Sequence, residues 1–190
     1  MAFACIGFLS IVGEVGLQSA MPGLSQQASL FTAIVYTGLL LYPAFTGGRR
    51  HEPRSPWWRG ATAVLLLLVA VTFLTLMGGD VSETWSLFEH VLTPLVVLVD
   101  WLAIGRHQSA AAWWHPLTWI GPPLAYLVYF LAADVGLYGS FLDPDDDAFA
   151  LTVLGFLAAV LAAGYLLYGC AKVKALATTS APPPQPPLRY

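Results

Sequence analysis

The chain has 190 residues, of which 57% are hydrophobic and 10% are charged, and its formal net charge is −3. Soluble domains carry about 25% charged residues, so this chain has too little polar surface to cover a water-facing exterior. The composition also excludes a disordered chain, a secreted module built on disulfides and a nucleic-acid binder, because cysteines are few and basic residues are not in excess.

Six apolar segments with few or no charges follow one another along the chain, and each predicts a transmembrane helix because about 20 apolar residues cross the hydrocarbon layer. They are 1–17, 29–45, 60–79, 85–104, 113–133 and 148–171. The first two are short, but an antiparallel bundle needs them. The fourth carries Glu89 and Asp100 near its ends, where a charge is less costly. We therefore predict an all-α membrane bundle of six transmembrane helices over residues 1–171. The tail at 172–190 is basic and then proline-rich.

The charged residues predict the orientation of this bundle. All basic residues lie between the second and third segments, between the fourth and fifth, or after the sixth. They are Arg49, Arg50, Arg54, Arg59, Arg106, Lys172, Lys174 and Arg189. Seven of the 11 acids lie in or beside the 3–4 and 5–6 loops. Because basic residues favour cytoplasmic loops, both termini are predicted to be cytoplasmic.

Polar residues within the predicted spans gather at one depth. With a rise of about 1.5 Å per residue, Thr32 lies about 5 Å and His90 about 8 Å below the outer boundary. Glu14, Tyr36 and Glu89 fall in the same outer third, and Ser86 shares a helix face with His90. These residues predict a polar pocket that opens toward the outer leaflet.

Structural interpretations of the same residues stay open. A membrane threonine commonly donates to its own i−4 carbonyl, as Thr32 would to Ala28. His90 could make an interhelical hydrogen bond, while Glu14 and Glu89 could reach the membrane boundary. We predict no cofactor and no metal, because His90 is the only histidine in the outer half and no metal-ligand spacing occurs inside a span.

Three stretches resemble a known family. They are Leu30-Phe31-Thr32, the run HVLTPLVVLVDW from His90 to Trp101, and YGSFLD from Tyr138 to Asp143. They resemble the androgen-induced-gene and androgen-dependent-inhibitor-regulating membrane proteins, and the chain is similar to their small bacterial relatives. The resemblance implies a six-helix protein of the bacterial plasma membrane. It also implies a threonine-type hydrolase of fatty-acid esters.

By motif, the nucleophile and base of that family correspond to Thr32 and His90. The implied reaction is attack by Thr32 on a lipid ester while His90 takes its proton, followed by hydrolysis of the acyl-threonine by water. Tyr36 or Ser86 would supply an oxyanion donor, and Glu14 or Asp134 would orient the histidine.

Three hypotheses of function follow. The first is the lipid-ester hydrolase. The second is a non-catalytic membrane protein that binds a lipid or a partner in the same pocket. A transporter is the third, but Glu14, Glu89 and Asp100 form no ladder of acids across the membrane centre. Membrane lipid is the expected partner, and the oligomeric state is left open.

Overall fold

The computed structural model describes residues 1–139 and 141–179, and within them the chain is helical without any strand. The elements are α1 (Ala2–Val15), α2 (Leu17–Ala20), α3 (Leu24–Phe45), α4 (Trp57–Leu76), α5 (Thr84–Leu87), the π-helical turns η1 (Phe88–Leu92) and η2 (Asp100–Ile104) on either side of α6 (Thr93–Val99), the 3₁₀ turn η3 (Gln108–Ala110), α7 (His115–Thr118), α8 (Gly121–Ala132), the 3₁₀ turn η4 (Gly136–Tyr138) and α9 (Phe149–Thr179).

Four helices of the described chain are long and apolar enough to cross a membrane. They are Leu24–Phe45, Trp57–Leu76, the continuous helix Thr84–Ile104 and Phe149–Ala177. Many of their large apolar side chains point away from the protein, including Leu40, Leu151 and Leu166. Such an exterior suits lipid and not water, which agrees with the composition. The four helices and this exterior indicate a helical membrane protein.

The first and fifth predicted spans differ from the helices observed. The α1 helix has 14 residues and ends before Gly16, whose φ of 82° interrupts the helix. The segment 113–133 is not one helix but two, because a proline stands in the first turn of both α7 and α8. Proline lacks an N–H and fits only the start of a helix. Six spans therefore remain a prediction, while four helices have the required length.

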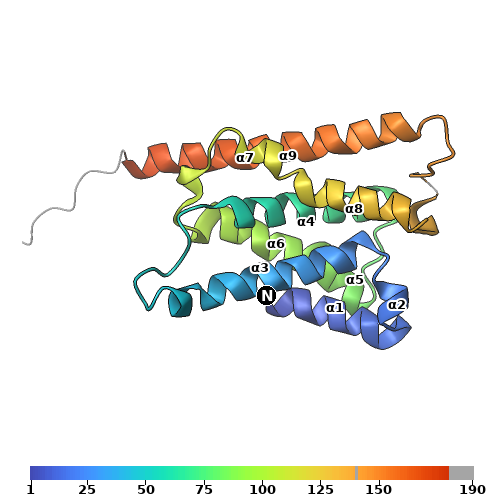
Figure 1. Cartoon of the computed structure of the whole chain (residues 1–190), viewed down its shortest axis with the longest axis horizontal. Helices are drawn as coiled ribbons and strands as arrows, with labels where there is room; N and C mark the ends of the chain where they lie inside the picture. The colour runs from blue at the N-terminus through green and yellow to red at the C-terminus, as the bar shows by residue number, and fades with distance from the viewer. Residues whose placement is uncertain (140, 180–190) are drawn as a thin grey trace, which may run out of the picture.

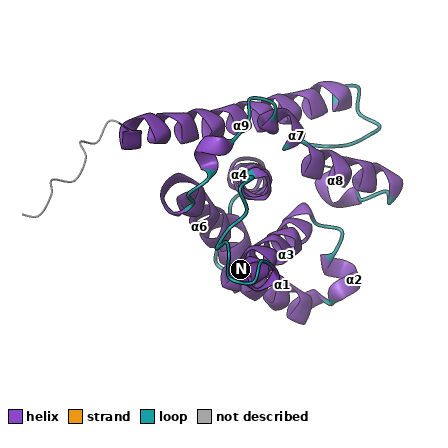
Figure 2. Ribbon diagram, turned by 60° about the vertical axis from the view of Figure 1, so that its left-hand side comes forward, coloured by secondary structure: helices purple, strands orange, loops and turns teal. Residues whose placement is uncertain are grey.

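The α4 helix lies at the centre of the bundle, and the other long helices surround it (Figure 2). Its residues Val64, Leu65 and Leu66 are at most 3% exposed and form the middle of the main hydrophobic core. A Cβ at Gly60 of this helix would overlap the ring of Trp119, so the glycine permits close contact between α4 and the fully buried indole.

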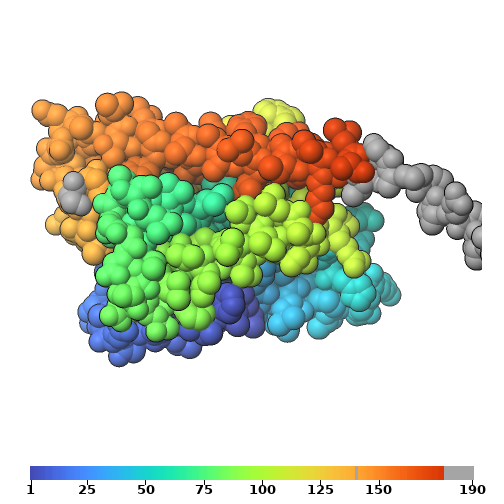
Figure 3. Space-filling model, turned by 180° about the vertical axis from the view of Figure 1, so that it is seen from behind, coloured from blue at the N-terminus to red at the C-terminus, as the bar shows by residue number. Residues whose placement is uncertain are grey.

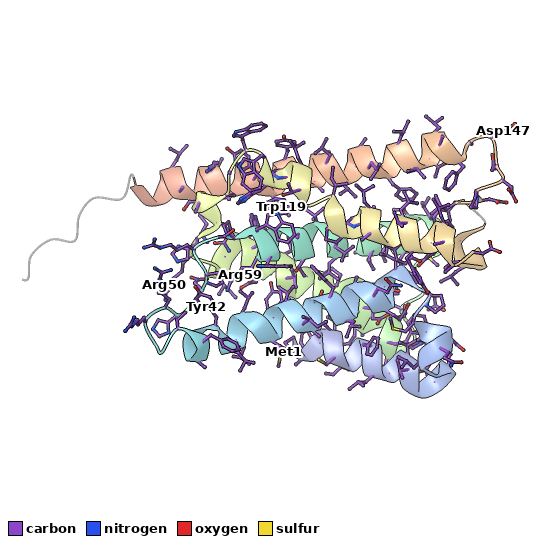
Figure 4. The ribbon with its side chains drawn as sticks, viewed as in Figure 1. Met1, Tyr42, Arg50, Arg59, Trp119 and Asp147 are labelled. Atoms are coloured by element: carbon purple, nitrogen blue, oxygen red, sulfur yellow. The ribbon has the colours of Figure 1, made fainter. Side chains whose placement is uncertain are left out.

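The helices run along the long axis of the molecule, so the loops gather at two ends (Figure 1). Arg50 and Arg59 lie toward one end, called here the basic end, and Asp147 lies at the other, the acidic end (Figure 4). Met1 lies between them. Seen from behind, the segment that contains α6 covers one face between α9 and the pair α1 and α3 (Figure 3).

The last helix is longer than the predicted span 148–171, because α9 continues to Thr179. Two lysines bind its final turns to η2 and to the segment that follows η2. Lys172 Nζ donates to the carbonyls of Ser109 and Ala111 at 2.7 and 2.8 Å, and Lys174 Nζ donates to that of Ala103 at 3.1 Å. The predicted proline-rich part of the tail, from residue 181, lies outside the described residues.

Candidate functional site

A cavity of about 390 Å³ lies inside the half of the bundle nearer the acidic end. Its walls come from α1, the α2–α3 region, α4, the start of the helix Thr84–Ile104, α8, η4 and α9. The volume falls within the range of about 300–1,000 Å³ that small-molecule sites occupy. The cavity is therefore large enough for a ligand.

Most of the cavity wall is apolar. Aromatic and aliphatic side chains from distant segments meet there, among them Leu68, Phe73, Phe130, Phe156 and Val160. Among the described residues that line it, none is Asp, Glu, Lys or Arg. A charged group inside this wall would lose its hydration without meeting an opposite charge. The cavity is suited to an uncharged, mainly hydrocarbon ligand.

Two tyrosines of the cavity wall bond the start of α3 and the loop before it. Tyr126 OH on α8 donates to the Pro22 carbonyl oxygen at 2.8 Å, and the Leu24 N–H donates to Tyr138 OH at 2.9 Å. Leu24 is the first residue of α3, so the second bond satisfies one of the free N–H groups at that helix start. These bonds connect the loop before α3 to the C-terminal half of the chain.

His90 lies in the cavity wall on the π-helical turn η1. Pro94 contributes to this turn, because it has no N–H to donate to the His90 carbonyl in the α-helical pattern. The N–H of Thr93 instead donates five residues back, to the Phe88 carbonyl. Such π-turns are rare and frequently occur at functional sites. Both π-turns of the helix Thr84–Ile104 carry buried ionisable residues, Asp100 being in the second.

Contacts on three sides fix the His90 ring. Nδ1 lies 3.0 Å from the Ser86 carbonyl oxygen, the Phe73 ring stacks on it at 3.6 Å between centroids, and the Trp85 ring meets it edge-on at 6.1 Å. A carbonyl oxygen only accepts, so Nδ1 carries the hydrogen and donates. In the neutral ring Nε2 is then left as a hydrogen-bond acceptor.

Glu89, the neighbour of His90, interacts with other residues. It is fully buried, and its Oε2 accepts from Gln26 Nε2 of α3 at 2.8 Å. Ser29 Oγ and the second carboxyl oxygen, Glu89 Oε1, are buried and have no hydrogen-bond partner among the described residues. The α1 helix passes close by at Gly7, where an added Cβ would lie 2.6 Å from Glu89 Cγ. Glu89 thus joins α1, α3 and η1.

Thr32, the predicted nucleophile, is fully buried on α3. Its Oγ1 donates to the Ala28 carbonyl at 2.7 Å, which is the local i−4 bond considered above. Among the described residues no hydrogen bond joins Thr32 to His90, and Thr32 does not line the cavity. The two residues predicted to act together are therefore found in separate hydrogen bonds.

Tyr36 belongs to a second polar cluster, nearer the basic end. Its OH donates to Asp100 Oδ2 at 2.8 Å, and Arg59 Nη1 lies 3.5 Å from Asp100 Oδ1. Arg59 also pairs with Glu52, with 3.2 Å between Nη2 and Oε2. This chain of contacts joins α3, α4 and η2. Tyr36 does not line the cavity.

The other predicted pocket residues do not meet His90 through their side chains. Ser86 is buried, and its hydroxyl donates to the Asp80 carbonyl at 2.6 Å. Only its backbone carbonyl bonds His90. Glu14 and Asp134 are exposed, and Asp134 follows α8 with a φ of 49°. Neither makes a hydrogen bond to the histidine in the described chain.

One wall residue escaped the sequence reasoning. Thr72 of α4 lines the cavity, and its buried Oγ1 has no hydrogen-bond partner among the described residues. Nothing in its sequence neighbourhood separates it from Thr75 one turn later, which donates to the Val71 carbonyl at 2.7 Å. Only the packing around α4 distinguishes these two threonines.

In the described part of the chain, no three His, Cys, Asp or Glu side chains come together as a group that could hold a metal ion. Comparisons with protein-family models, with curated proteins and with solved structures give no match to this chain.

Proposed function

We propose that this protein binds a single-chain lipid inside its bundle, without chemical turnover. One observation carries the proposal: a cavity of about 390 Å³ whose described lining is apolar and free of charged side chains. The protein is surrounded by hydrocarbon chains, so a lipid chain is the ligand that both the lining and the surroundings favour. The bond between Thr32 and Ala28 supports binding over catalysis, because it engages the predicted nucleophile elsewhere.

The proposed protein has six spans, with both termini in the cytoplasm of a bacterial cell and the cavity in the outer half of the plasma membrane. The gathering of Arg50 and Arg59 opposite Asp147 supports this orientation. Single cysteines at Ser55, Ser82 and Asp145 test it. An impermeant thiol reagent added to intact cells should label only the last two. Labelling at position 55 would reverse the orientation and put the cavity in the inner leaflet.

Filling the cavity tests lipid binding. Val153 and Leu154 are neighbours on α9, but Val153 lines the cavity whereas Leu154 is 64% exposed on the outer surface. We expect Val153→Trp to lose the lipid that co-purifies with the protein in mild detergent. Leu154→Trp should keep it. Native mass spectrometry measures the bound lipid, and equal lipid in both variants would contradict binding in this cavity.

Lipid-ester hydrolysis by Thr32 and His90 is the second candidate. It rests on the resemblance to the androgen-induced-gene family, and the acceptor Nε2 of His90 in the cavity wall favours it. A panel of fatty-acid esters offered to the detergent-purified chain tests it. Turnover that disappears in both Thr32→Ala and His90→Ala would replace the binding proposal with this one. Bound lipid without turnover of any ester would leave the binding proposal standing.

A further inference from the structure

Most hydrogen-bonding groups in the cavity wall are already paired inside the protein. Gln26 donates its amide to Glu89, Ser25 Oγ donates to Gln26 Oε1, and Tyr126 and Tyr138 bond the loop before α3. These groups stabilise the wall and are already engaged in hydrogen bonds within the protein. Two of the polar atoms that remain for a ligand belong to lining residues of α4 and η1.

His90 contributes one of these atoms. Its Nδ1–H is engaged by the Ser86 carbonyl, and its ring is held between Phe73 and Trp85. The ring therefore presents Nε2 in a fixed position. As an acceptor in an apolar wall, Nε2 gains most from a ligand group that donates a hydrogen bond.

Thr72 contributes the other. On α4 the hydroxyls of Thr62 and Thr75 donate to the carbonyls four residues back, at 2.8 and 2.7 Å. The buried Thr72 Oγ1 makes no such bond among the described residues. Thr72 directly precedes Phe73, whose ring covers His90, so it lies at nearly the same level of the bundle. Its hydroxyl can donate to a ligand oxygen.

The charge of the wall restricts the ligand further. With no charged side chain in the described lining, a carboxylate or phosphate would be buried without a counter-charge, which is costly. An ester or an alkane has no hydrogen to donate to Nε2. A hydroxyl group can donate to His90 and accept from Thr72.

From this combination we infer that the cavity binds a neutral single-chain lipid that ends in a hydroxyl group, a long-chain alcohol, with His90 and Thr72 holding the hydroxyl. The inference rests on the proposed function, because it names the lipid class that the cavity would take. Here His90 acts as a binding residue. The chain of the alcohol would lie along the aromatic wall that Phe130 and Phe156 share with the other lining residues.

Competition binding to the detergent-purified full chain tests the inference, with radiolabelled hexadecanol as the probe. Unlabelled hexadecanol, methyl palmitate, palmitate and hexadecane are the competitors. We expect the alcohol to compete best, with an advantage over the ester of about five- to tenfold for the hydrogen bonds that the ester cannot make.

Four variants separate the hydroxyl site from the hydrocarbon site. Thr72→Val keeps the shape of the side chain but removes the hydroxyl, and His90→Phe keeps a ring against Phe73 but removes the acceptor. Each should weaken hexadecanol binding by about five- to tenfold while hexadecane competes unchanged. Thr75→Val is the matched control, because its hydroxyl is bonded within α4. Thr72→Ser should restore binding.

The outcomes distinguish the two proposals. Equal competition by alcohol, ester and alkane, with no effect of Thr72→Val, would overturn the hydroxyl site and leave lipid binding intact. Palmitate competing as well as hexadecanol would also overturn it, because an anion would then be accepted. If none of the four ligands binds the wild-type protein, lipid binding itself is overturned.

Discussion

Replacing Gly7 by alanine tests the packing that positions the π-turn η1 and its His90. A Cβ added at Gly7 would lie 2.6 Å from Glu89 Cγ and 3.3 Å from Phe88 Cβ. Carbon atoms in contact lie about 3.5–4.0 Å apart, so α1 and η1 would have to separate by about 1 Å. Glu89 cannot easily turn aside, because it is fully buried and its carboxylate accepts from Gln26 at 2.8 Å.

The expected change in stability is the difference between two effects. Overpacking costs about 1–3 kcal/mol, whereas replacing glycine by alanine in a helix contributes about 1 kcal/mol of stability. We therefore expect Gly7→Ala to lower the free energy of unfolding by up to about 2 kcal/mol, at most roughly a thirtyfold change in the equilibrium constant. Reversible unfolding in mixed detergent micelles, followed by tryptophan fluorescence, measures it.

Gly13 on the same helix provides the matched control, because an added Cβ there would meet nothing within 4 Å. Gly13→Ala should leave stability unchanged or raise it by up to about 1 kcal/mol, the helix-propensity effect alone. If both variants are equally stable, α1 does not approach η1 as closely as described. The reasoning on how η1 is held would then be refuted.

Three further expectations concern packing, a buried hydrogen bond and a surface carboxylate. Gly60→Ala should destabilise the protein by about 1–3 kcal/mol in the same unfolding assay, because the new methyl group would overlap the buried Trp119 ring; an unchanged transition would argue against this contact. Tyr36→Phe removes the 2.8 Å hydrogen bond to the Asp100 carboxylate and should cost about 1.5 kcal/mol, and a variant as stable as wild type would show that the bond contributes nothing net. The exposed Asp80 carboxylate accepts a backbone N–H, which holds its pKa below the ordinary aspartate value, so that bond is kept above this depressed pKa and lost as the pH falls through it. An NMR titration of its carboxyl carbon that gives an ordinary or raised pKa would contradict this.

The sequence predicts the helical membrane character of the chain well, because the length and apolarity of a segment are local properties. The predicted 60–79 and 85–104 correspond closely to Trp57–Leu76 and Thr84–Ile104. Hydropathy does not report where a helix is interrupted. The break within 113–133 follows from prolines that fit only in first turns, and the π-turn at His90 follows from the missing N–H of Pro94.

The candidate site could be predicted in part. Depth along the helices singled out His90, which does line the cavity. The depth of a residue does not say which way its side chain points or which group it bonds. The sequence therefore could not predict that Thr32 donates to the Ala28 carbonyl or that Tyr36 donates to Asp100. Thr72 was missed because a lone threonine in an apolar helix has the same local pattern whether or not its hydroxyl is paired.

The central position of α4 has a consequence for assembly. This helix packs against α3, which precedes it in the chain, and against α6 and α9, which follow it. The helices around α4 are therefore synthesised one after another, and α9 is the last helix of the described chain. This helix adds Val153, Phe156 and Val160 to the cavity wall. A chain that stopped before α9 would contain every polar residue of the site but would lack one side of its enclosure.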